Sequence, residues 1–261
     1  MTQQRSEFLE LDGCRLHLYR GGEGEPVLFL HGASGGGFWL PFMAELARDH
    51  DVIAPDHPGF WQSSDPEWLD SVGNLSFFYL DLLSKLNVGP VHVVGSSLGG
   101  WIAAEMAVRN TNLIKSLTLV CAVGICVDGK PIENTSGISP QEHLRRFCHD
   151  ETSMLARQRQ LESVEPELRA RNRATVMRLC GQPWFHNPKL PNWLHRIDRG
   201  TLILWGASDE IVPLPFGHEW NRLIPSSRLT ALPRSGHAPF VEQPDEFNDE
   251  LRKFWRQRQD C

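Results

Sequence analysis

Short apolar runs alternate with longer amphipathic segments along most of the chain. Near-continuous apolar runs are typical of strands in a sheet that helices cover on both faces. Such runs lie at residues 27–30, 52–54, 91–94, 117–120 and 202–205. Helical patterns separate them, at residues 38–48, 75–86, 98–109 and 216–223. The alternation predicts a mostly parallel α/β sheet flanked by helices.

The two ends of the chain extend this pattern. Residues 8–11 and 15–19 flank the dipeptide Asp12-Gly13, which is a strong signal for a two-residue hairpin. We therefore expect the sheet to begin with an antiparallel pair of strands. An amphipathic stretch at about 245–255 predicts a last helix that closes the fold.

The alternation stops in the middle of the chain, where no strand-like run appears. Ser139-Pro140-Gln141-Glu142 has the order of a helix N-cap, a proline at the first helical position and a glutamate three residues after the cap. Residues 152–161 and 166–180 are further helix candidates. Because strands resume at Thr201, we expect one core of residues 1–123 and 200–261 with a helical cap inserted at 124–199. A separate helical domain is the alternative.

The main chemical signal follows the apolar run at residues 91–94. This run enters Gly95-Ser96-Ser97-Leu98-Gly99, which has the form G-x-S-x-G, and a helical pattern leaves it. The strand–turn–helix setting is that of a nucleophile elbow, where small residues relieve backbone crowding around the serine. A motif centred on Ser96 would require glycine at position 94, where Val94 stands. Ser97 is therefore the predicted nucleophile.

A serine hydroxyl needs a general base, and the base needs an acid that orients it. His237 lies in a turn after a predicted strand at residues 228–232. Asp209 follows the buried run at 202–205, with Glu210 beside it and Asp128 farther away as competing acids. Enzymes with this elbow carry nucleophile, acid and base in the chain order that Ser97, Asp209 and His237 have. These three residues are the predicted catalytic triad.

A glycine-rich loop, residues 31–37, follows the apolar run at 27–30. Glycine lets backbone N–H groups approach a ligand closely, so we predict that the N–H groups of Ala33 and Leu98 form an oxyanion hole. The loop lacks the Lys-Ser/Thr of a P-loop and the glycine spacing of a dinucleotide site. His31 is expected to be structural. The reaction is expected to need neither a metal nor an organic cofactor.

Together these residues resemble the α/β-hydrolase family over essentially the whole chain. The matching segments are His31-Gly32, Asp56-His57-Pro58-Gly59-Phe60, the pentapeptide at 95–99, Gly206-Ala207-Ser208-Asp209 and Gly236-His237. The resemblance implies an eight-stranded, mostly parallel sheet, a helical cap after the sixth strand, and the triad Ser97, Asp209 and His237. One segment departs from the family: Phe60-Trp61-Gln62 precedes Ser63 where a small, glycine-rich step is common. This departure alters the wall of the pocket.

The residue at the elbow narrows the reaction that the resemblance implies. Dehalogenases and epoxide hydrolases of this family use aspartate there, so Ser97 favours acyl chemistry. We expect hydrolysis of a carboxylic ester, lactone or thioester through an acyl-enzyme. The alternative is C–C bond hydrolysis of aromatic meta-cleavage products. Those enzymes typically carry Asn before the nucleophile and Trp after the histidine, where this chain has Ser96 and Ala238. A non-catalytic ligand-binding protein on the same fold is a second alternative.

Aromatic residues near the predicted triad favour an apolar or aryl-bearing small molecule as the substrate. The expected pocket residues, mostly aromatic, are Phe38, Trp39, Phe60, Trp61, Trp184, Phe185 and Val212.

Composition adds limits on partners and location. The formal net charge of −6, without a dense basic run, argues against nucleic acid and anionic membranes as partners. The chain shows neither an apolar signal segment at its start nor a stretch long enough for a membrane span. We expect a cytoplasmic protein whose six cysteines, none of them in a C-x-x-C pair, are reduced. A homodimer is compatible with the sequence but not indicated by it.

Overall fold

The computed structural model describes residues 4–33, 35–130, 132 and 137–257. Cys261, one of the cysteines expected to be reduced, lies outside this part. The described cysteines are free thiols: Cys14, Cys121, Cys126, Cys148 and Cys180.

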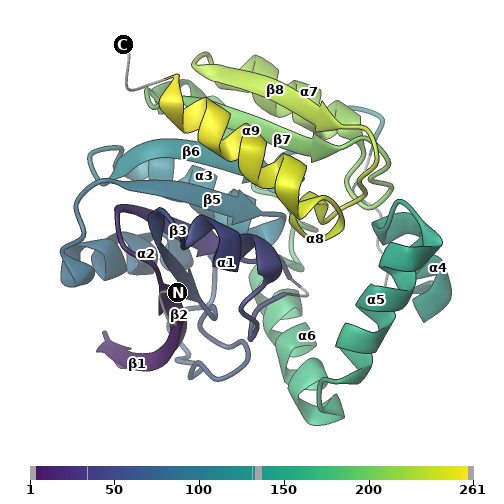
Figure 1. Cartoon of the computed structure of the whole chain (residues 1–261), viewed down its shortest axis with the longest axis horizontal. Helices are drawn as coiled ribbons and strands as arrows, with labels where there is room; N and C mark the ends of the chain where they lie inside the picture. Colours follow the sequence, from purple (N-terminus) through teal and green to yellow (C-terminus); the bar gives the residue numbers. More distant parts are fainter. Residues whose placement is uncertain (1–3, 34, 131, 133–136, 258–261) are drawn as a thin grey trace.

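Eight strands form one sheet in the order β1-β2-β4-β3-β5-β6-β7-β8 (Figure 1). Strands β1 and β2 form the expected antiparallel hairpin, β2 is antiparallel to β4, and every later pair is parallel. The prediction of a mostly parallel α/β-hydrolase sheet is confirmed. The strands are β1 (Arg5–Leu11), β2 (Cys14–Gly21), β3 (Glu25–Leu30), β4 (His50–Pro55), β5 (Val91–Ser96), β6 (Ile114–Val120), β7 (Thr201–Gly206) and β8 (Ser227–Leu232).

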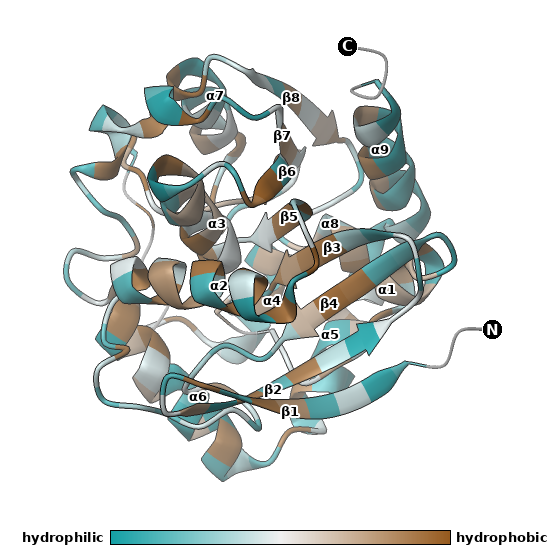
Figure 2. Ribbon diagram, turned by 90° about the vertical axis from the view of Figure 1, so that its left-hand side faces the viewer, coloured by the Kyte–Doolittle hydropathy of each residue, from teal (hydrophilic) through white to brown (hydrophobic). Residues whose placement is uncertain are grey.

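The central strands explain the apolar runs in the sequence. Every residue of β5 and of β7 is buried, because helices cover both faces of the sheet there. Figure 2 shows hydrophobic residues concentrated along these inner strands.

Two layers of helices enclose the sheet (Figures 1 and 2). One layer contains α1 (Pro41–Leu46), α8 (Pro239–Glu242) and α9 (Pro244–Arg256), and the other contains α2 (Val72–Leu86), α3 (Leu98–Arg109) and α7 (Leu214–Leu223). The pattern at 38–48 predicted a longer first helix, but α1 begins only at Pro41, whose ring suits the first helical position. Among the described helices, none is long and apolar enough to cross a bilayer.

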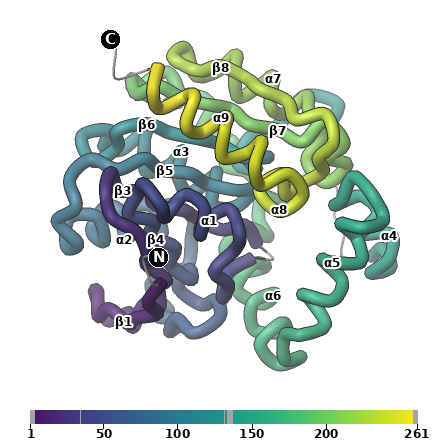
Figure 3. Tube along the Cα trace, in the orientation of Figure 1, coloured from purple at the N-terminus to yellow at the C-terminus, as the bar shows by residue number. Residues whose placement is uncertain are grey.

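The segment between β6 and β7 leaves the core and returns to it (Figure 3). It contains α4 (Pro140–Phe147), α5 (Glu151–Glu162), α6 (Pro166–Cys180) and the 3-10 turns η2 (Leu190–Asn192) and η3 (Leu194–Arg196). Helix α4 begins as predicted, with the Ser139 hydroxyl accepting from the Glu142 N–H at 3.1 Å. Helix α5 buries none of its residues. We propose that residues 124–199 act as the cap over the carboxyl ends of the strands.

Candidate active site

Ser97 lies in the turn between β5 and α3. Its backbone has φ 52° and ψ −112°, a conformation that is costly for a residue with a Cβ and that occurs at functional sites. A Cβ at Gly95 would collide with the Gly99 carbonyl, and a Cβ at Gly99 would collide with that of Leu30. The Ser97 N–H donates to the Val120 carbonyl at 2.8 Å, which ties the turn to β6. The two glycines therefore permit the strained turn that presents Ser97.

Asp209 and His237 form a buried pair at the ends of β7 and β8. His237 Nδ1 donates to Asp209 Oδ2 at 2.7 Å. The other carboxylate oxygen accepts from the backbone N–H groups of Ile211 and Val212 at 2.8 and 2.9 Å. Glu210 instead points to Arg145 on the surface, and Asp128 is exposed. Only Asp209 of the three candidate acids is thus placed to orient His237.

Ser97 and His237 line one cavity of about 1130 Å³. Among the described residues the Ser97 hydroxyl has no hydrogen-bond partner, so it faces this cavity without a competing contact. Nucleophile–base contacts in enzymes often close only when substrate binds. The arrangement can perform acyl chemistry on a ligand held in the cavity.

The predicted oxyanion donors lie on both sides of Ser97. A Cβ on Gly32 would lie 3.1 Å from the Ser97 Cβ, so the start of the glycine-rich loop lies directly beside Ser97. Leu98 is the first residue of α3, where the N–H has no acceptor within the helix and the helix dipole is positive. In the described part of the chain the Ala33 N–H also has no partner. Both N–H groups are therefore available to an oxyanion.

Five of the seven predicted pocket residues line the cavity: Phe38, Trp61, Trp184, Phe185 and Val212. The prediction is wrong for the other two. Phe60 is fully buried and packs against the ring of His31, with the ring centroids 5.3 Å apart. Trp39 lies against β2, where a Cβ on Gly21 would be 3.1 Å from its ring. Phe60 therefore belongs to the core, and Trp39 is partly buried against it.

Residues 27–250 match the model of the Alpha/beta hydrolase family. This chain belongs to the α/β-hydrolase family. It is 25% identical to the 2-hydroxy-6-oxo-6-(2'-aminophenyl)hexa-2,4-dienoic acid hydrolase of Metapseudomonas resinovorans, over 97% of this chain and 91% of that one. It is 28% identical to the 2-hydroxy-6-oxo-6-phenylhexa-2,4-dienoate hydrolase of Comamonas testosteroni, over 95% and 94%. A mutant meta-cleavage product hydrolase from Pseudomonas fluorescens IP01, in complex with acetates, superposes with a TM-score of 0.82 and 26% identity, over 97% and 98%.

The inserted segment between β6 and β7 contacts His237, the predicted base, directly. The backbone N–H of His237 donates to the Phe147 carbonyl at 2.7 Å. The rings of the two residues also meet edge to face, with their centroids 5.0 Å apart. The Glu210 N–H donates to the Arg146 carbonyl at 3.1 Å. The end of α4 thus fixes both the loop of His237 and the loop of Asp209. The sequence carries no signal for these contacts, because they join residues far apart in the chain.

Two further ionisable side chains, Glu242 and Cys121, lie beside the Asp209–His237 pair. Glu242 accepts from the N–H groups of Gly236 and His149, at 2.9 and 2.7 Å, and so holds the loop of His237. Burial raises the pKa of Glu242. The Cys121 sulfur, an Asp209 carboxylate oxygen and a His237 ring nitrogen all lie within 4.8 Å of one another, so these three side chains could in principle hold a metal ion. Burial, with Asp209 nearby, raises the pKa of Cys121 well above its usual value, so the thiol stays neutral. A neutral thiol fits an acid–base pair better than a metal centre.

Proposed function

We propose that this hydrolase cleaves the carbon–carbon bond beside the ketone of a 2-hydroxy-6-oxohexa-2,4-dienoate that carries an aryl group. The observation that carries the proposal is whole-length similarity to hydrolases named for such compounds, at 25% and 28% identity. The solved meta-cleavage product hydrolase with 26% identity adds support. An aryl-bearing substrate also agrees with the aromatic residues in the cavity.

The site supplies groups for the acyl-transfer steps of this reaction. The dienol first tautomerises to its 2,6-diketone, which moves the 2-hydroxyl proton to C5. Ser97 Oγ then attacks the C6 ketone carbon while His237 takes its proton, and Asp209 stabilises the imidazolium. The N–H groups of Ala33 and Leu98 stabilise the resulting oxyanion. Collapse of this adduct breaks the C5–C6 bond. The electron pair on C5 delocalises through the 3,4-double bond onto the 2-oxo oxygen, and the enolate that forms receives a proton. Water activated by His237 then releases the acyl group from Ser97 as a carboxylic acid.

The cavity also offers positive charge for the substrate carboxylate. Arg157 and Arg173 line it. The Arg157 guanidinium lies 5.3 Å from the centre of the Phe147 ring, which itself contacts His237. Burial lowers the pKa of Arg157, but a guanidinium remains charged at neutral pH. A carboxylate at one end and an aryl ketone at the other therefore match the charged and aromatic parts of the lining.

Ester hydrolysis, the first expectation from the sequence, is the second candidate. Ser96 and Ala238 favour it, because they replace the Asn and Trp that are typical of the C–C hydrolases. The same nucleophile, base and oxyanion donors would serve an ester, whose alcohol leaves in place of the carbon fragment.

A substrate panel separates the two candidates. We expect kcat/KM for 2-hydroxy-6-oxo-6-phenylhexa-2,4-dienoate, followed by loss of its absorbance, to exceed that for p-nitrophenyl acetate and butyrate by at least about 100-fold, or about 3 kcal/mol of barrier. Ser97→Ala is the control for both. Preference for the esters would favour the second candidate. Tight binding of the dienoate without turnover of any compound would contradict both and favour a binding protein.

A further inference from the structure

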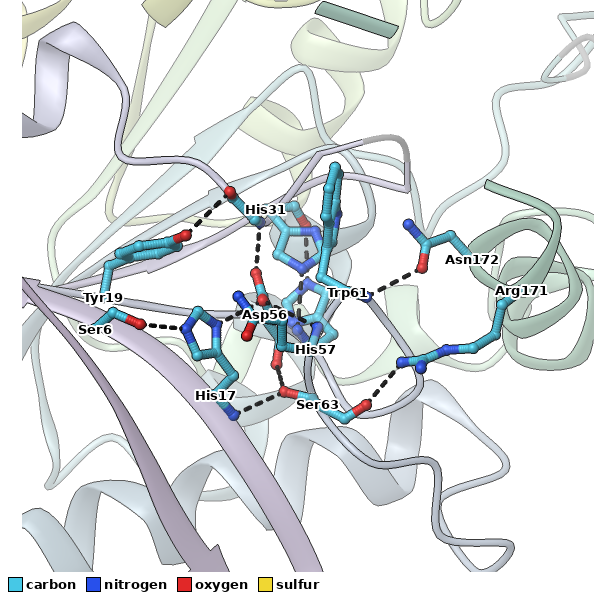
Figure 4. Close-up of polar contacts among 12 residues, drawn as sticks. Ser6, His17, Tyr19, His31, Asp56, His57, Trp61, Ser63, Arg171 and Asn172 are labelled. Atoms are coloured by element: carbon cyan, nitrogen blue, oxygen red, sulfur yellow. Dashed lines mark hydrogen bonds and ion pairs between the residues drawn. The ribbon is translucent and has the colours of Figure 1, made fainter. Parts of the chain in front are cut away.

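Gly37 is held at both of its backbone polar groups. Its N–H donates to Asp56 Oδ1 at 2.6 Å, and its carbonyl accepts from the Tyr19 hydroxyl at 3.1 Å. Figure 4 shows Tyr19 and Asp56 reaching the glycine-rich loop from the side of the sheet. Gly37 has φ +67°, where a side chain would be strained. Gly37, at the far end of the loop that carries Ala33, is thus fixed to β2 and to the end of β4.

The Asp56 carboxylate is itself immobilised. His17 Nδ1 lies 2.7 Å from Asp56 Oδ2, and the Ser6 hydroxyl lies 2.7 Å from the other ring nitrogen of His17 (Figure 4). Asp56 and His17 are 1% and 0% exposed. The Asp56 carbonyl also accepts from the Ser63 hydroxyl at 2.7 Å. A buried carboxylate is tolerated only when such partners offset its desolvation, so His17 keeps Asp56 in place.

Tyr19 is suited to remain a hydrogen-bond donor. Burial, with Asp56 nearby, raises the pKa of its phenol, so the hydroxyl keeps its proton at every pH at which the enzyme would work. His17 and Tyr19 also pack edge to face, with ring centroids 4.9 Å apart. The Tyr19 hydroxyl and the Asp56 carboxylate, which hydrogen-bond to Gly37, therefore belong to one packed cluster with His17.

Trp61 covers the same glycines from the cavity side. A Cβ on Gly36 or Gly37 would collide with the Trp61 ring. The Trp61 backbone N–H donates at 3.1 Å to Asn172 Oδ1 of the cap helix α6 (Figure 4). Gly36 and Gly37 are thus enclosed between the sheet and the ring of Trp61, whose backbone is tied to α6.

We propose that Asp56 and Tyr19 are positioning residues, which hold the glycine-rich loop so that the Ala33 N–H points at the developing oxyanion. This inference rests on the proposed roles of Ser97 and Ala33. Oxyanion donors accelerate a reaction because they are fixed before charge develops, so a loosened loop should weaken transition-state stabilisation more than substrate binding.

Two variants and one matched control test the proposal. Asp56→Asn weakens the hydrogen bond that Asp56 accepts from the Gly37 N–H, and Tyr19→Phe removes the one that Tyr19 donates to the Gly37 carbonyl. Asp51→Asn breaks the Arg20–Asp51 ion pair, also on β4 but without contact to the loop. We expect kcat to fall by about 10- to 100-fold in Asp56→Asn and about 3- to 10-fold in Tyr19→Phe, with KM within about 3-fold of wild type. Affinity for a boronic acid that forms a tetrahedral adduct should fall in parallel with kcat. Asp51→Asn should match wild type.

The rate at which a fluorophosphonate labels Ser97 separates this inference from the proposed function, because it requires no turnover of a natural substrate. Slower labelling in both variants, with wild-type rates in Asp51→Asn, would support the proposal. Wild-type kcat and labelling rates in Tyr19→Phe would overturn it, and this variant removes one oxygen only, so it remains informative if Asp56→Asn does not fold. Failure of the wild type to label at Ser97 would overturn the proposed function together with the inference.

Discussion

Replacing Asp209 by asparagine tests how the structure sets the tautomer of His237. The carboxylate accepts three N–H groups, from His237 Nδ1 on one oxygen and from Ile211 and Val212 on the other. An amide has one oxygen and one NH₂ group, so it cannot accept on both sides. The two backbone bonds retain the oxygen, and the NH₂ group then faces Nδ1. The imidazole proton moves to Nε2, where His237 can no longer take the proton of Ser97.

The expected cost follows from this tautomer change. The equivalent change in a serine protease triad lowers kcat by about 10⁴-fold, which corresponds to about 5 kcal/mol of barrier. The side-chain volume barely changes, and the second N–H of the new amide is left without a partner in a buried position, so the free energy of unfolding should fall by only about 1–3 kcal/mol. The assay is kcat at saturating substrate, with the Tm measured on the same preparation.

Glu210→Gln is the matched control for Asp209→Asn. It removes a charge one residue away, from an exposed carboxylate whose partner is Arg145 at 3.0 Å. Surface ion pairs contribute about 0–1 kcal/mol, so this variant should keep kcat and Tm near wild type. If Asp209→Asn retained more than about one tenth of the wild-type kcat, the tautomer argument would be refuted.

Three further predictions concern stability. Gly99→Ala should lower the free energy of unfolding in urea titrations by more than about 3 kcal/mol, because the new Cβ would collide with the carbonyls of Leu30 and His31. Gly137→Ala is the control: its new Cβ would have no neighbour within 4 Å, so it should cost under about 1 kcal/mol. Glu105→Gln should cost about 2 kcal/mol, because this buried carboxylate binds Arg109, Trp101 and Asn187; equal Tm values would contradict this. Burial lowers the pKa of His92 in the folded protein to about 4. The unfolded chain therefore takes up a proton on this residue at a higher pH than the folded protein does. As the pH falls from about 6.5 towards 4, this residue should lower the free energy of unfolding by about 3 kcal/mol. His92→Gln should flatten that profile, and an unchanged slope would count against it.

Local features made the fold and the strand–turn–helix setting of Ser97 predictable. The strands β5 and β7 are buried on both faces, which leaves continuous apolar runs in the sequence. Helix α3 has the predicted bounds, Leu98–Arg109, because the elbow starts it and its apolar residues repeat regularly. The pairing of Asp209 with His237 followed from one rule: the carboxyl ends of parallel strands meet at one edge of the sheet.

Side-chain direction and long-range contacts could not be predicted in the same way. Phe60 and Trp61 are adjacent, but only Trp61 lines the cavity, because Phe60 packs on His31 in the core. The hydrogen bonds of Gly37 to Asp56 and of His237 to Phe147 join residues far apart in the chain, and the periodic pattern of apolar residues does not encode such contacts. The substrate class was also hidden, since Ser96 and Ala238 pointed to esters while similarity along the whole chain favours the C–C hydrolases.

Mass mapping after a fluorophosphonate reaction tests the central claim most directly. The account predicts one adduct, on the peptide that contains Ser97, formed much more slowly in His237→Ala, and no turnover of the phenyl dienoate by Ser97→Ala. An adduct on another residue, or full turnover by Ser97→Ala, would contradict the assignment of Ser97 as the nucleophile of this hydrolase.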